Sequence, residues 1–355
     1  MNSDEFETKD LVAERARMQG TPLMDSDIAT FVWLGERPPL LRGDFTGWGE
    51  GDPAALAKAS SGVWTYRLAL PPDAYIEYAF FDGDQRLLDP LNPRRISNGV
   101  GGYNNYFYMR QAQPTKLVRL GRGVRQGRVT KHVLYAPHLI GGGKRTVHLY
   151  QPPVKEATPL VVVWDGQDYL RRARLNVMVD HLIALGRMRP VALAMVEHGG
   201  AARMIEYACS EATLLFLLEL VLPLAKQQLS LIDVAESPGA YGVLGASMGG
   251  LMALYTAARL PHIFGHALSQ SGAFSFNGYD SVLLDLFSFG REFPVKVWMD
   301  VGIYDYQRIV ASNRRLRDML VERGVALEYR EYNAGHNYPA WRDDMWRGLE
   351  YLYGI

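Results

Sequence analysis

The sequence predicts two domains, a small all-β sandwich followed by a larger α/β domain built on a mostly parallel sheet. Three observations lead to this prediction. The chain has 355 residues, which is long for a single hydrophobic core. Residues 30–112 contain short apolar runs of β type separated by glycine, proline and aspartate. From residue 130 onward, apolar strands alternate with helix-length segments, as they do in βαβ units.

The composition describes an ordinary globular protein and excludes several function classes. Hydrophobic residues make up 48% of the chain and charged residues 21%, while 38 basic and 38 acidic side chains cancel. A net charge of zero gives no overall field for nucleic acid or a membrane surface, so we expect neither as a partner. The single cysteine, Cys209, excludes an intrachain disulfide and the cysteine clusters of structural zinc sites.

Residues 1–29 form an N-terminal segment, in which residues 3–20 predict a short amphipathic helix. The first stretch, MNSDEFETKD, is acidic and polar, so it lacks the basic and apolar regions of a signal peptide. No apolar run approaches the roughly 18 residues of a membrane span. We therefore expect a cytoplasmic protein.

Residues 30–112 predict an antiparallel sandwich, because runs such as TFVWLG, GVWTYRLALP and AYIEYAFF are separated by turn residues. Trp48 and Trp64 lie in this region, and tryptophan can stack on sugars. Packing inside the sandwich is the commoner use of large aromatic residues, and we favour it here. Residues 113–129 are polar, basic and glycine-bearing, which predicts a linker.

The α/β domain occupies residues 130–355 and opens with a β-hairpin formed by RVTKHVLYAP and KRTVHLYQPP. The run PLVVVWDG at 159–166 is typical of a strand that is buried on both faces of a parallel sheet. Strands and helices then alternate. The further predicted strands are 190–198, 241–244, 265–272, 296–302 and 326–332, and the predicted helices are 173–186, 213–229, 248–260, 312–324 and 341–354.

The segment GASMG at 245–249 follows an apolar run and precedes an alanine-rich helix. This is the pattern G-x-S-x-G of a nucleophile elbow, in which the serine stands on a sharp turn between a strand and a helix. Small residues flank the serine because the strand and the helix pack closely there. We therefore predict that Ser247 is a catalytic nucleophile.

His336 is the predicted general base among eight histidines. It lies in NAGHN, a loop between the last predicted strand and the last predicted helix. In the α/β-hydrolase order of serine, acid and histidine, this loop carries the base. His198, at the end of an earlier predicted strand, is the alternative.

The acid is expected between the elbow and His336. Asp305 follows the strand KVWMDVG, whereas Asp300 lies inside that strand. A residue inside a strand points to a face of the sheet, while the loop after the strand faces the site, so we favour Asp305 and keep Asp300 as the alternative. Asp305 would hold the imidazole in the correct tautomer and stabilise the imidazolium.

Two backbone amides are expected to bind the oxyanion. One is the N–H of Met248, the first residue of the helix after the serine. The other is the N–H of Gln167, in the loop after the strand that ends in WDG. This chemistry needs no metal and no organic cofactor, and we expect none.

Several motifs together resemble the enterochelin esterase catalytic domain, within the wider group of esterase D, feruloyl esterases and mycolyltransferases. The motifs are VVVWDGQDY, RMIEYACSEATLLFLLELVLPLAK, VLGASMGGLMALYTAARLPHIFGHALSQSGAF, MDVGIYD and EYNAGHNYPAWRDDMWRGLEYLY. The resemblance spans about residues 130–355. It implies an α/β-hydrolase domain with the nucleophile on Ser247, the acid on Asp305, the base on His336 and the oxyanion amides on Gln167 and Met248.

The sandwich resembles two kinds of module. GDFTGW at 43–48 and DPLNPR at 89–94 are similar to the early-set sandwich of glycogen-branching and related enzymes, some of which bind carbohydrate. DPLNP also ends the N-terminal sandwich of enterochelin esterases, where the module would shape the substrate pocket. The sandwich is compact, which is closer to the glycogen-type module.

The resemblance implies a small-molecule ester as substrate, either the serine trilactone of a catecholate siderophore or an aromatic acyl ester of the feruloyl type. The pair Arg203 and Glu206 of RMIE matches a family position near the pocket, with a surface ion pair as the alternative. An aromatic acyl group would stack on aromatic residues next to the catalytic loops. The expected substrate contacts are therefore Arg203, Tyr169, Tyr306 and Trp341.

Three functional hypotheses remain at this stage. The first is a serine hydrolase of carboxylic esters. The second is an acyltransferase or thioesterase with the same triad, in which another nucleophile clears the acyl-enzyme. The third is a carbohydrate-binding protein without catalytic activity, against which the ordered set of Ser247, Asp305 and His336 argues. The natural ester and the oligomeric state are left open.

Overall fold

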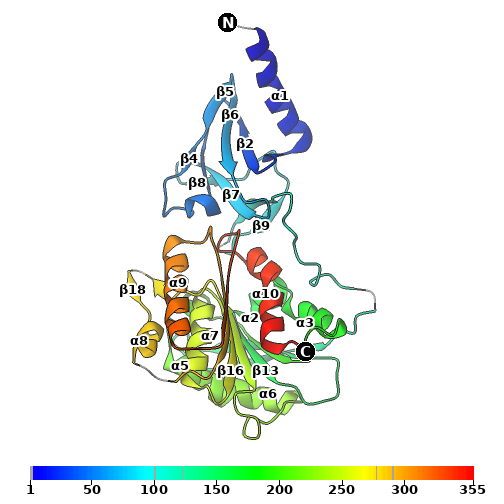
Figure 1. Ribbon diagram of the computed structural model, residues 1–355, viewed down its shortest axis with the longest axis vertical. Coiled ribbons are helices and arrows are strands. Elements are labelled where there is room, and N and C mark those ends of the chain that lie inside the picture. The colour runs from blue at the N-terminus through cyan, green and yellow to red at the C-terminus, as the bar shows by residue number, and fades with distance from the viewer. Residues whose placement is uncertain (1–2, 100, 122, 277, 290–291) are drawn as a thin grey trace. The chain divides into compact units, whose positions relative to one another are not determined.

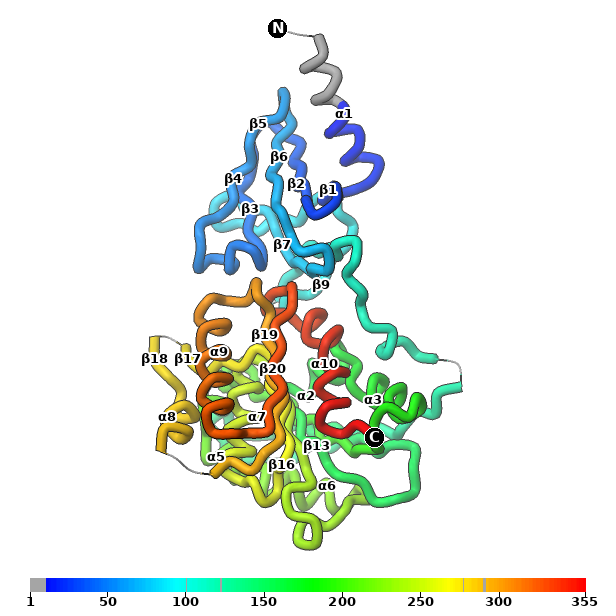
Figure 2. Tube along the Cα trace, viewed as in Figure 1, coloured from blue at the N-terminus to red at the C-terminus, as the bar shows by residue number. Residues whose placement is uncertain are grey.

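The computed structural model describes residues 3–99, 101–121, 123–276, 278–289 and 292–355 (Figures 1 and 2). The chain forms two compact units. The first consists of Met1–Pro114 together with Gly302–Gln307 and Tyr332–Ala340, and the second of Thr115–Val301, Arg308–Glu331 and Trp341–Ile355. Two short segments from the C-terminal third of the chain therefore belong to the unit of the sandwich. The domain boundaries expected from the sequence, with a linker at 113–129, stay a prediction.

The first unit contains the helix α1 (Ser3–Gln19) and two antiparallel sheets. One sheet has the order β1-β2-β6-β5, with β1 (Leu23–Asp25), β2 (Ile28–Leu34), β6 (Val63–Ala69) and β5 (Ala57–Ser60). The other has the order β4-β3-β7-β10-β9, with β8 paired to β7. Its strands are β4 (Ala54–Ala55), β3 (Leu40–Gly43), β7 (Tyr75–Asp82), β10 (Tyr103–Tyr108), β9 (Arg95–Ser97) and β8 (Gln85–Leu87).

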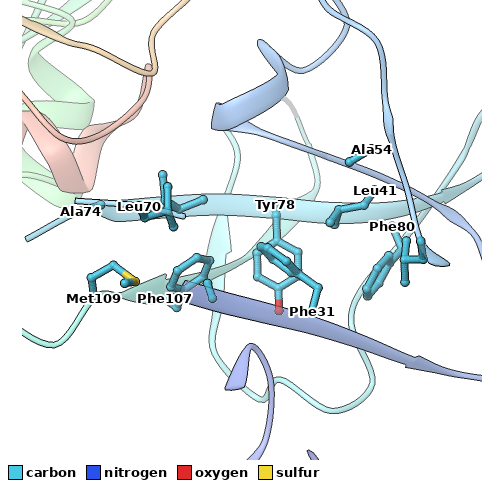
Figure 3. Close-up of a cluster of buried hydrophobic side chains, with 12 residues drawn as sticks. Phe31, Leu41, Ala54, Leu70, Ala74, Tyr78, Phe80, Phe107 and Met109 are labelled. Carbon is cyan, nitrogen blue, oxygen red and sulfur yellow. The ribbon is translucent and has the colours of Figure 1, made fainter. Parts of the chain in front are cut away.

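Aromatic side chains form the core of this sandwich (Figure 3). Phe31 of β2 meets Tyr78 of β7 edge to face, with ring centroids 4.8 Å apart. Phe107 of β10 completes the group, 5.8 Å from Phe31 and 5.9 Å from Tyr78. Such T-shaped pairs are the arrangement that aromatic rings prefer. The prediction of an N-terminal all-β sandwich is confirmed.

The second unit is built on an eight-stranded sheet of order β11-β12-β14-β13-β15-β16-β19-β20. The first three strands pair antiparallel, and β14 through β19 pair parallel. The edge strand β20 also runs parallel to β19, because Val297 donates to Ala326 and Ile303 donates to Tyr332. The strands are β11 (Arg128–Tyr135), β12 (Lys144–Gln151), β13 (Leu160–Trp164), β14 (Ala192–Val196), β15 (Tyr241–Ala246), β16 (Phe264–Gln270), β19 (Lys296–Gly302) and β20 (Leu327–Tyr332).

Helices cover both faces of this sheet, with α7 and α9 on one face and α3 and α10 on the other (Figure 1). Parallel strands with helices on both faces make up the α/β-hydrolase type of sheet that the sequence predicts. A small hairpin of β17 (Ser275–Phe276) and β18 (Tyr279–Asp280) also lies in this unit. The helices are α2 (Gly166–Arg171), α3 (Leu175–Ala184), α4 (Arg203–Glu206), α5 (Glu211–Phe216), α6 (Leu222–Gln228), α7 (Met248–Arg259), α8 (Val282–Ser288), α9 (Gln307–Glu322) and α10 (Tyr338–Tyr353).

The predicted helix at 213–229 is interrupted by a π-helical turn, Leu217–Val221, between α5 and α6. Pro223 stands at the start of α6 and has no N–H for the usual hydrogen bond. The chain accommodates it with a wider turn, in which the N–H of Leu222 donates to the carbonyl of Leu217. Among the described residues no single helix is long and apolar enough to cross a membrane, although the bent pair Gly200–Glu206 and Glu211–Gln228 meets that length and composition.

Candidate active site

Ser247 stands on the turn between β15 and α7 with φ 58° and ψ −124°. A non-glycine residue with positive φ is strained, and such strain persists only where the surroundings impose it. The N–H of Ser247 donates to Gln270 at 2.9 Å, and its carbonyl accepts from Ala273 at 3.0 Å and from Leu251 at 3.0 Å. These bonds hold the nucleophile elbow in the geometry that the sequence predicts.

The two glycines of the elbow are required by close packing. A Cβ added to Gly245 would stand less than 3.0 Å from the backbone of Gly249. A Cβ on Gly249 would stand 2.9 Å from Oδ2 of Asp165, in the neighbouring loop. The elbow therefore packs directly against the loop after β13.

That loop is the place of the predicted oxyanion amides. Asp165 follows β13 with φ 57° and ψ 39°, and α2 begins at the next residue. Gln167 lies in the first turn of α2 and Met248 in the first turn of α7, where backbone N–H groups have no intrahelical acceptor. The side chain of Gln167 accepts the N–H of His198 at 3.2 Å, which helps to fix this turn.

Arg203 ties the loop to the elbow. Its Nε and Nη2 each donate at 2.6 Å to one carboxylate oxygen of Asp165, which is 1% exposed. Nη2 also lies 3.4 Å from the carbonyl oxygen of Ala246, the residue before Ser247. The hydroxyl of Tyr207 accepts the N–H of Asp165 at 3.2 Å. A buried acid is thus paired and hydrogen-bonded, as its burial requires.

Arg203 and Glu206 bind partners on different elements. Arg203 binds Asp165, while Glu206 is buried and bound to Arg145. The guanidinium of Arg203 holds the loop after β13, and its role as a substrate contact stays a prediction.

Asp305 and His336 lie together within the first unit. Nδ1 of His336 is 2.9 Å from both carboxylate oxygens of Asp305. The Asp305 side chain is fully buried, and its Oδ1 also accepts the N–H of Tyr306 at 2.7 Å. His336 retains 18% exposure. This is the arrangement of an acid that orients an imidazole through Nδ1.

The alternative acid and base are engaged elsewhere. Asp300 accepts from the indole N–H of Trp298 at 2.8 Å and from the amide of Gln270 at 3.1 Å. Burial and the nearby Asp344 carboxylate raise the pKa of Asp300 well above its usual value. His198 lies beside α2, where its Nδ1 accepts the N–H of Gly200 at 2.9 Å.

Two of the predicted substrate contacts are buried inside the second unit. The side chain of Tyr169 has no exposed surface, and its hydroxyl donates to Gln270 at 3.1 Å. The indole of Trp341 is 4% exposed and donates to the hydroxyl of Ser271 at 3.0 Å. Both rings are hydrogen-bonded to residues at or just after the end of β16, and their role as substrate contacts stays a prediction. Sequence reasoning missed Gln270, which links Tyr169, Asp300 and Trp341.

Tyr306 lies next to the imidazole, with ring centroids 5.4 Å from His336. Burial raises the pKa of the Tyr306 hydroxyl, so the phenol stays neutral. Its role as a substrate contact stays a prediction. Among the described residues, no group of three or more His, Cys, Asp or Glu side chains is arranged to hold a metal ion.

Comparisons with known proteins relate this chain to esterases. The family model described as "Putative esterase" matches residues 140–352. The iron(III) enterobactin esterase of Dickeya dadantii (strain 3937) is 27% identical over 228 residues, which make up 59% of this chain and 52% of that protein. The iron(III) enterobactin esterase of Escherichia coli (strain K12) is 26% identical over 201 residues, or 55% and 49% of the two chains. The chain thus spans about half the length of these curated relatives.

Solved structures show the same fold. The ferric enterobactin esterase of Salmonella typhimurium superposes with a TM-score of 0.77 at 20% identity, covering 93% of this chain and 95% of that one. The enterobactin esterase of Shigella flexneri, solved in the presence of enterobactin, gives 0.76 at 21% identity over 93% and 94%. The α/β-hydrolase fold with an N-terminal all-β domain and the resemblance to esterases are confirmed, and the chain belongs to the esterase family.

Proposed function

We propose that this protein hydrolyses carboxylic esters through an acyl-enzyme on Ser247. The observation that carries the proposal is the strained elbow, which holds Ser247 at φ 58° between β15 and α7 in a chain of the esterase family. A serine at positive φ costs free energy, and backbone strain of this kind is concentrated at functional sites. Nucleophilic attack on an ester carbonyl is the use that this turn has in α/β-hydrolases.

In the proposed reaction His336 takes the proton of Ser247, and Asp305 stabilises the imidazolium. The 2.9 Å contacts between Asp305 and Nδ1 of His336 support this assignment. The topology supports it as well. The strands β15, β19 and β20 run parallel in one sheet, so their carboxyl ends point in the same direction.

The N–H groups of Met248 and Gln167 bind the oxyanion of the tetrahedral intermediate. Two helix N-terminal amides suit a developing negative charge, because they are fixed before the reaction begins. Each donor of this kind contributes roughly 3 kcal/mol to lowering the barrier. His336 then protonates the leaving alcohol and later activates the water that clears the acyl-enzyme.

The substrate class that we propose is a catecholate siderophore ester. Relatives of this chain are esterases of iron(III) enterobactin and iron(III) salmochelin. The alternative substrate is an aromatic acyl ester of the feruloyl type, and the following experiment distinguishes the two.

The test compares wild type with Ser247→Ala on enterobactin, methyl ferulate and p-nitrophenyl acetate. We expect serine-dependent cleavage of enterobactin that is well above cleavage of the two simpler esters. Preference for methyl ferulate would keep the mechanism and overturn the siderophore assignment. Equal rates for wild type and a folded Ser247→Ala would overturn the proposed nucleophile. Product analysis with added alcohols separates hydrolysis from acyl transfer.

A further inference from the structure

The loop that carries His336 packs on a residue of the sandwich within the first unit. Gly335 precedes His336, and a Cβ added to Gly335 would stand less than 3.0 Å from Cβ, Cγ and Oδ1 of Asp44. The carboxyl group of Asp44 therefore lies directly against the backbone next to the imidazole. A side chain at position 335 would displace either this loop or Asp44.

The residue on the other side of His336 contacts the same carboxyl group. Nδ2 of Asn337 lies 3.4 Å from Oδ2 of Asp44, which is a long hydrogen bond. Oδ1 of Asn337 accepts the N–H of Ala340 at 3.0 Å and so caps the start of α10. One carboxyl group of the sandwich thus contacts the residues immediately before and after the proposed base.

The carboxyl group of Asp44 is itself held in place by the sandwich. It is 3% exposed, and it begins the short helical turn Asp44–Thr46 after β3. Its Oδ2 accepts the N–H of Glu77 at 2.8 Å, and its Oδ1 accepts the indole N–H of Trp48 at 2.9 Å. The sandwich therefore holds both oxygens in place. The indole N–H of Trp48 therefore stabilises the turn that begins at Asp44.

Two further contacts bind the same loop to the sandwich. The carbonyl of Asn333 accepts the N–H of Tyr75 at 2.9 Å, and its side-chain amide donates to Asp73 at 2.6 Å. Ala334 is buried in a cluster with Tyr75 and Ala340. Residues 333–337 are thus held along their length by one edge of the sandwich.

We infer that Asp44 is a positioning residue for His336, which makes the sandwich a part of the catalytic apparatus. The inference rests on the proposed function, because it assigns a role toward the proposed base. Asp44 fixes Gly335 and Asn337, and these fix the direction in which Nδ1 of His336 meets Asp305. Burial and the nearby carboxylates of Glu77 and Asp305 raise the pKa of Asp44, so an acid at this position costs stability. A positioning role explains why it is nevertheless present.

The test uses Asp44→Asn in the full chain, with Asp89→Asn as the matched control. Asp89 is also a buried sandwich carboxylate with two side-chain donors, Thr21 and Tyr78, but within the part of the chain that the structure describes it makes no hydrogen bond to the His336 loop. We expect Asp44→Asn to lower kcat for p-nitrophenyl acetate at least about tenfold with KM within about twofold, since small misplacements of catalytic groups are that costly. Asp89→Asn should lower the melting temperature and leave kcat within about twofold of wild type. Equal kcat for Asp44→Asn and Asp89→Asn would overturn the inference.

A readout without turnover separates this inference from the proposed function. The proton between Nδ1 of His336 and Asp305 gives a far-downfield proton NMR signal, assigned by its loss in His336→Gln. We expect the signal in wild type, Ser247→Ala and Asp89→Asn, and its shift or loss in Asp44→Asn. If esters are not cleaved but this pattern holds, the proposed function fails and the positioning role stands. An unchanged signal in Asp44→Asn overturns the positioning role whatever the activity.

Asn337→Ser serves if Asp44→Asn does not fold. Serine keeps the cap of α10 and removes the amide that reaches Asp44. We expect kcat to fall in this variant as well, but by less than in Asp44→Asn. The downfield signal should also shift. Wild-type values for both would overturn the inference.

Discussion

The guanidinium of Arg203 donates a hydrogen bond of 2.6 Å to each of the two carboxylate oxygens of Asp165. Asp165 has a positive φ of 57° and begins the turn that presents the N–H of Gln167. Because Arg203 also reaches the carbonyl of Ala246, one arginine joins the proposed oxyanion loop to the nucleophile elbow.

This geometry predicts that Arg203→Lys lowers kcat by about 10- to 100-fold. Lysine keeps the positive charge but replaces the planar two-pronged donor with a single point charge, so the loop loses its fixed direction. The side chain is 22% exposed, so we expect a stability loss toward the lower end of the 3–5 kcal/mol typical of broken buried pairs. Ester turnover and urea unfolding measure the two effects.

Arg315→Lys is the control, since Arg315 forms an exposed pair with Asp280. It should leave both turnover and unfolding unchanged. An unchanged kcat in Arg203→Lys would contradict the role given to the loop.

The partner of Arg203 also shows where sequence reasoning ends. Alternation of strands and helices is a local signal, and it predicted the sheet, the elbow and the order of Ser247, Asp305 and His336. The link from Arg203 to Asp165 joins residues 38 positions apart, and that from Asn337 to Asp44 joins residues 293 apart. Contacts between residues so far apart in the sequence are determined by tertiary packing, and no spacing pattern predicts them.

The structure differs from the sequence predictions for two further reasons, which are the burial of side chains and the shortness of some elements. Tyr169 and Trp341 are buried, and a sequence does not tell a buried ring from an exposed one. The helix α2 has only six residues, too few for its period to be recognised. The helix α9 begins at Gln307, five residues before the predicted start.

Asp305→Asn is predicted to lower kcat by about 10³- to 10⁴-fold in a protein that stays folded. An amide in place of the carboxylate favours the wrong tautomer of His336 and does not stabilise the imidazolium. Because Asp305 does not bind the ester, KM should change little. Steady-state kinetics on a simple ester measures both constants.

Asp300→Asn is the natural comparison, since Asp300 is the alternative acid. Its carboxylate is occupied by Trp298 and Gln270, so we expect its effect on stability to exceed its effect on kcat. A greater loss of kcat in Asp300→Asn than in Asp305→Asn would reverse the assignment.

Gly245→Ala is predicted to destabilise the second unit by about 3 kcal/mol, at the high end for overpacking. The new methyl group would stand less than 3.0 Å from the backbone of Gly249. Gly249 has no room to retreat, because it packs against Asp165. The midpoint of urea unfolding measures the loss. Gly49→Ala is the control, because its nearest neighbour is the flexible end of Arg42, 3.3 Å away; an equal loss there would contradict the packing argument.

His266 is predicted to make the protein less stable in mild acid. Burial lowers the pKa of its imidazole below the usual value of 6.5, and the charges of Arg189 and Lys296 act in the same direction. Between the folded and unfolded pKa values the unfolded chain binds more protons, so the stability from the neutral imidazole is present above about pH 6.5 and is lost as the pH falls through the folded value. His266→Phe keeps an aromatic ring beside Tyr353, whose centroid is 5.0 Å away, and removes the titration.

Urea unfolding at about pH 7.5 and about pH 5.5 tests this prediction, since the two values lie on either side of the ordinary histidine pKa. Wild type should lose more free energy of unfolding between the two values than His266→Phe, by up to about 1.4 kcal/mol for each unit of pKa shift. The test compares the change in the free energy of unfolding between the two pH values in each protein. A pH-independent effect of the phenylalanine ring on stability therefore cancels. Equal losses in the two proteins would mean that the imidazole is protonated as readily in the folded state as in the unfolded chain, and that the charge beside Tyr353 is tolerated.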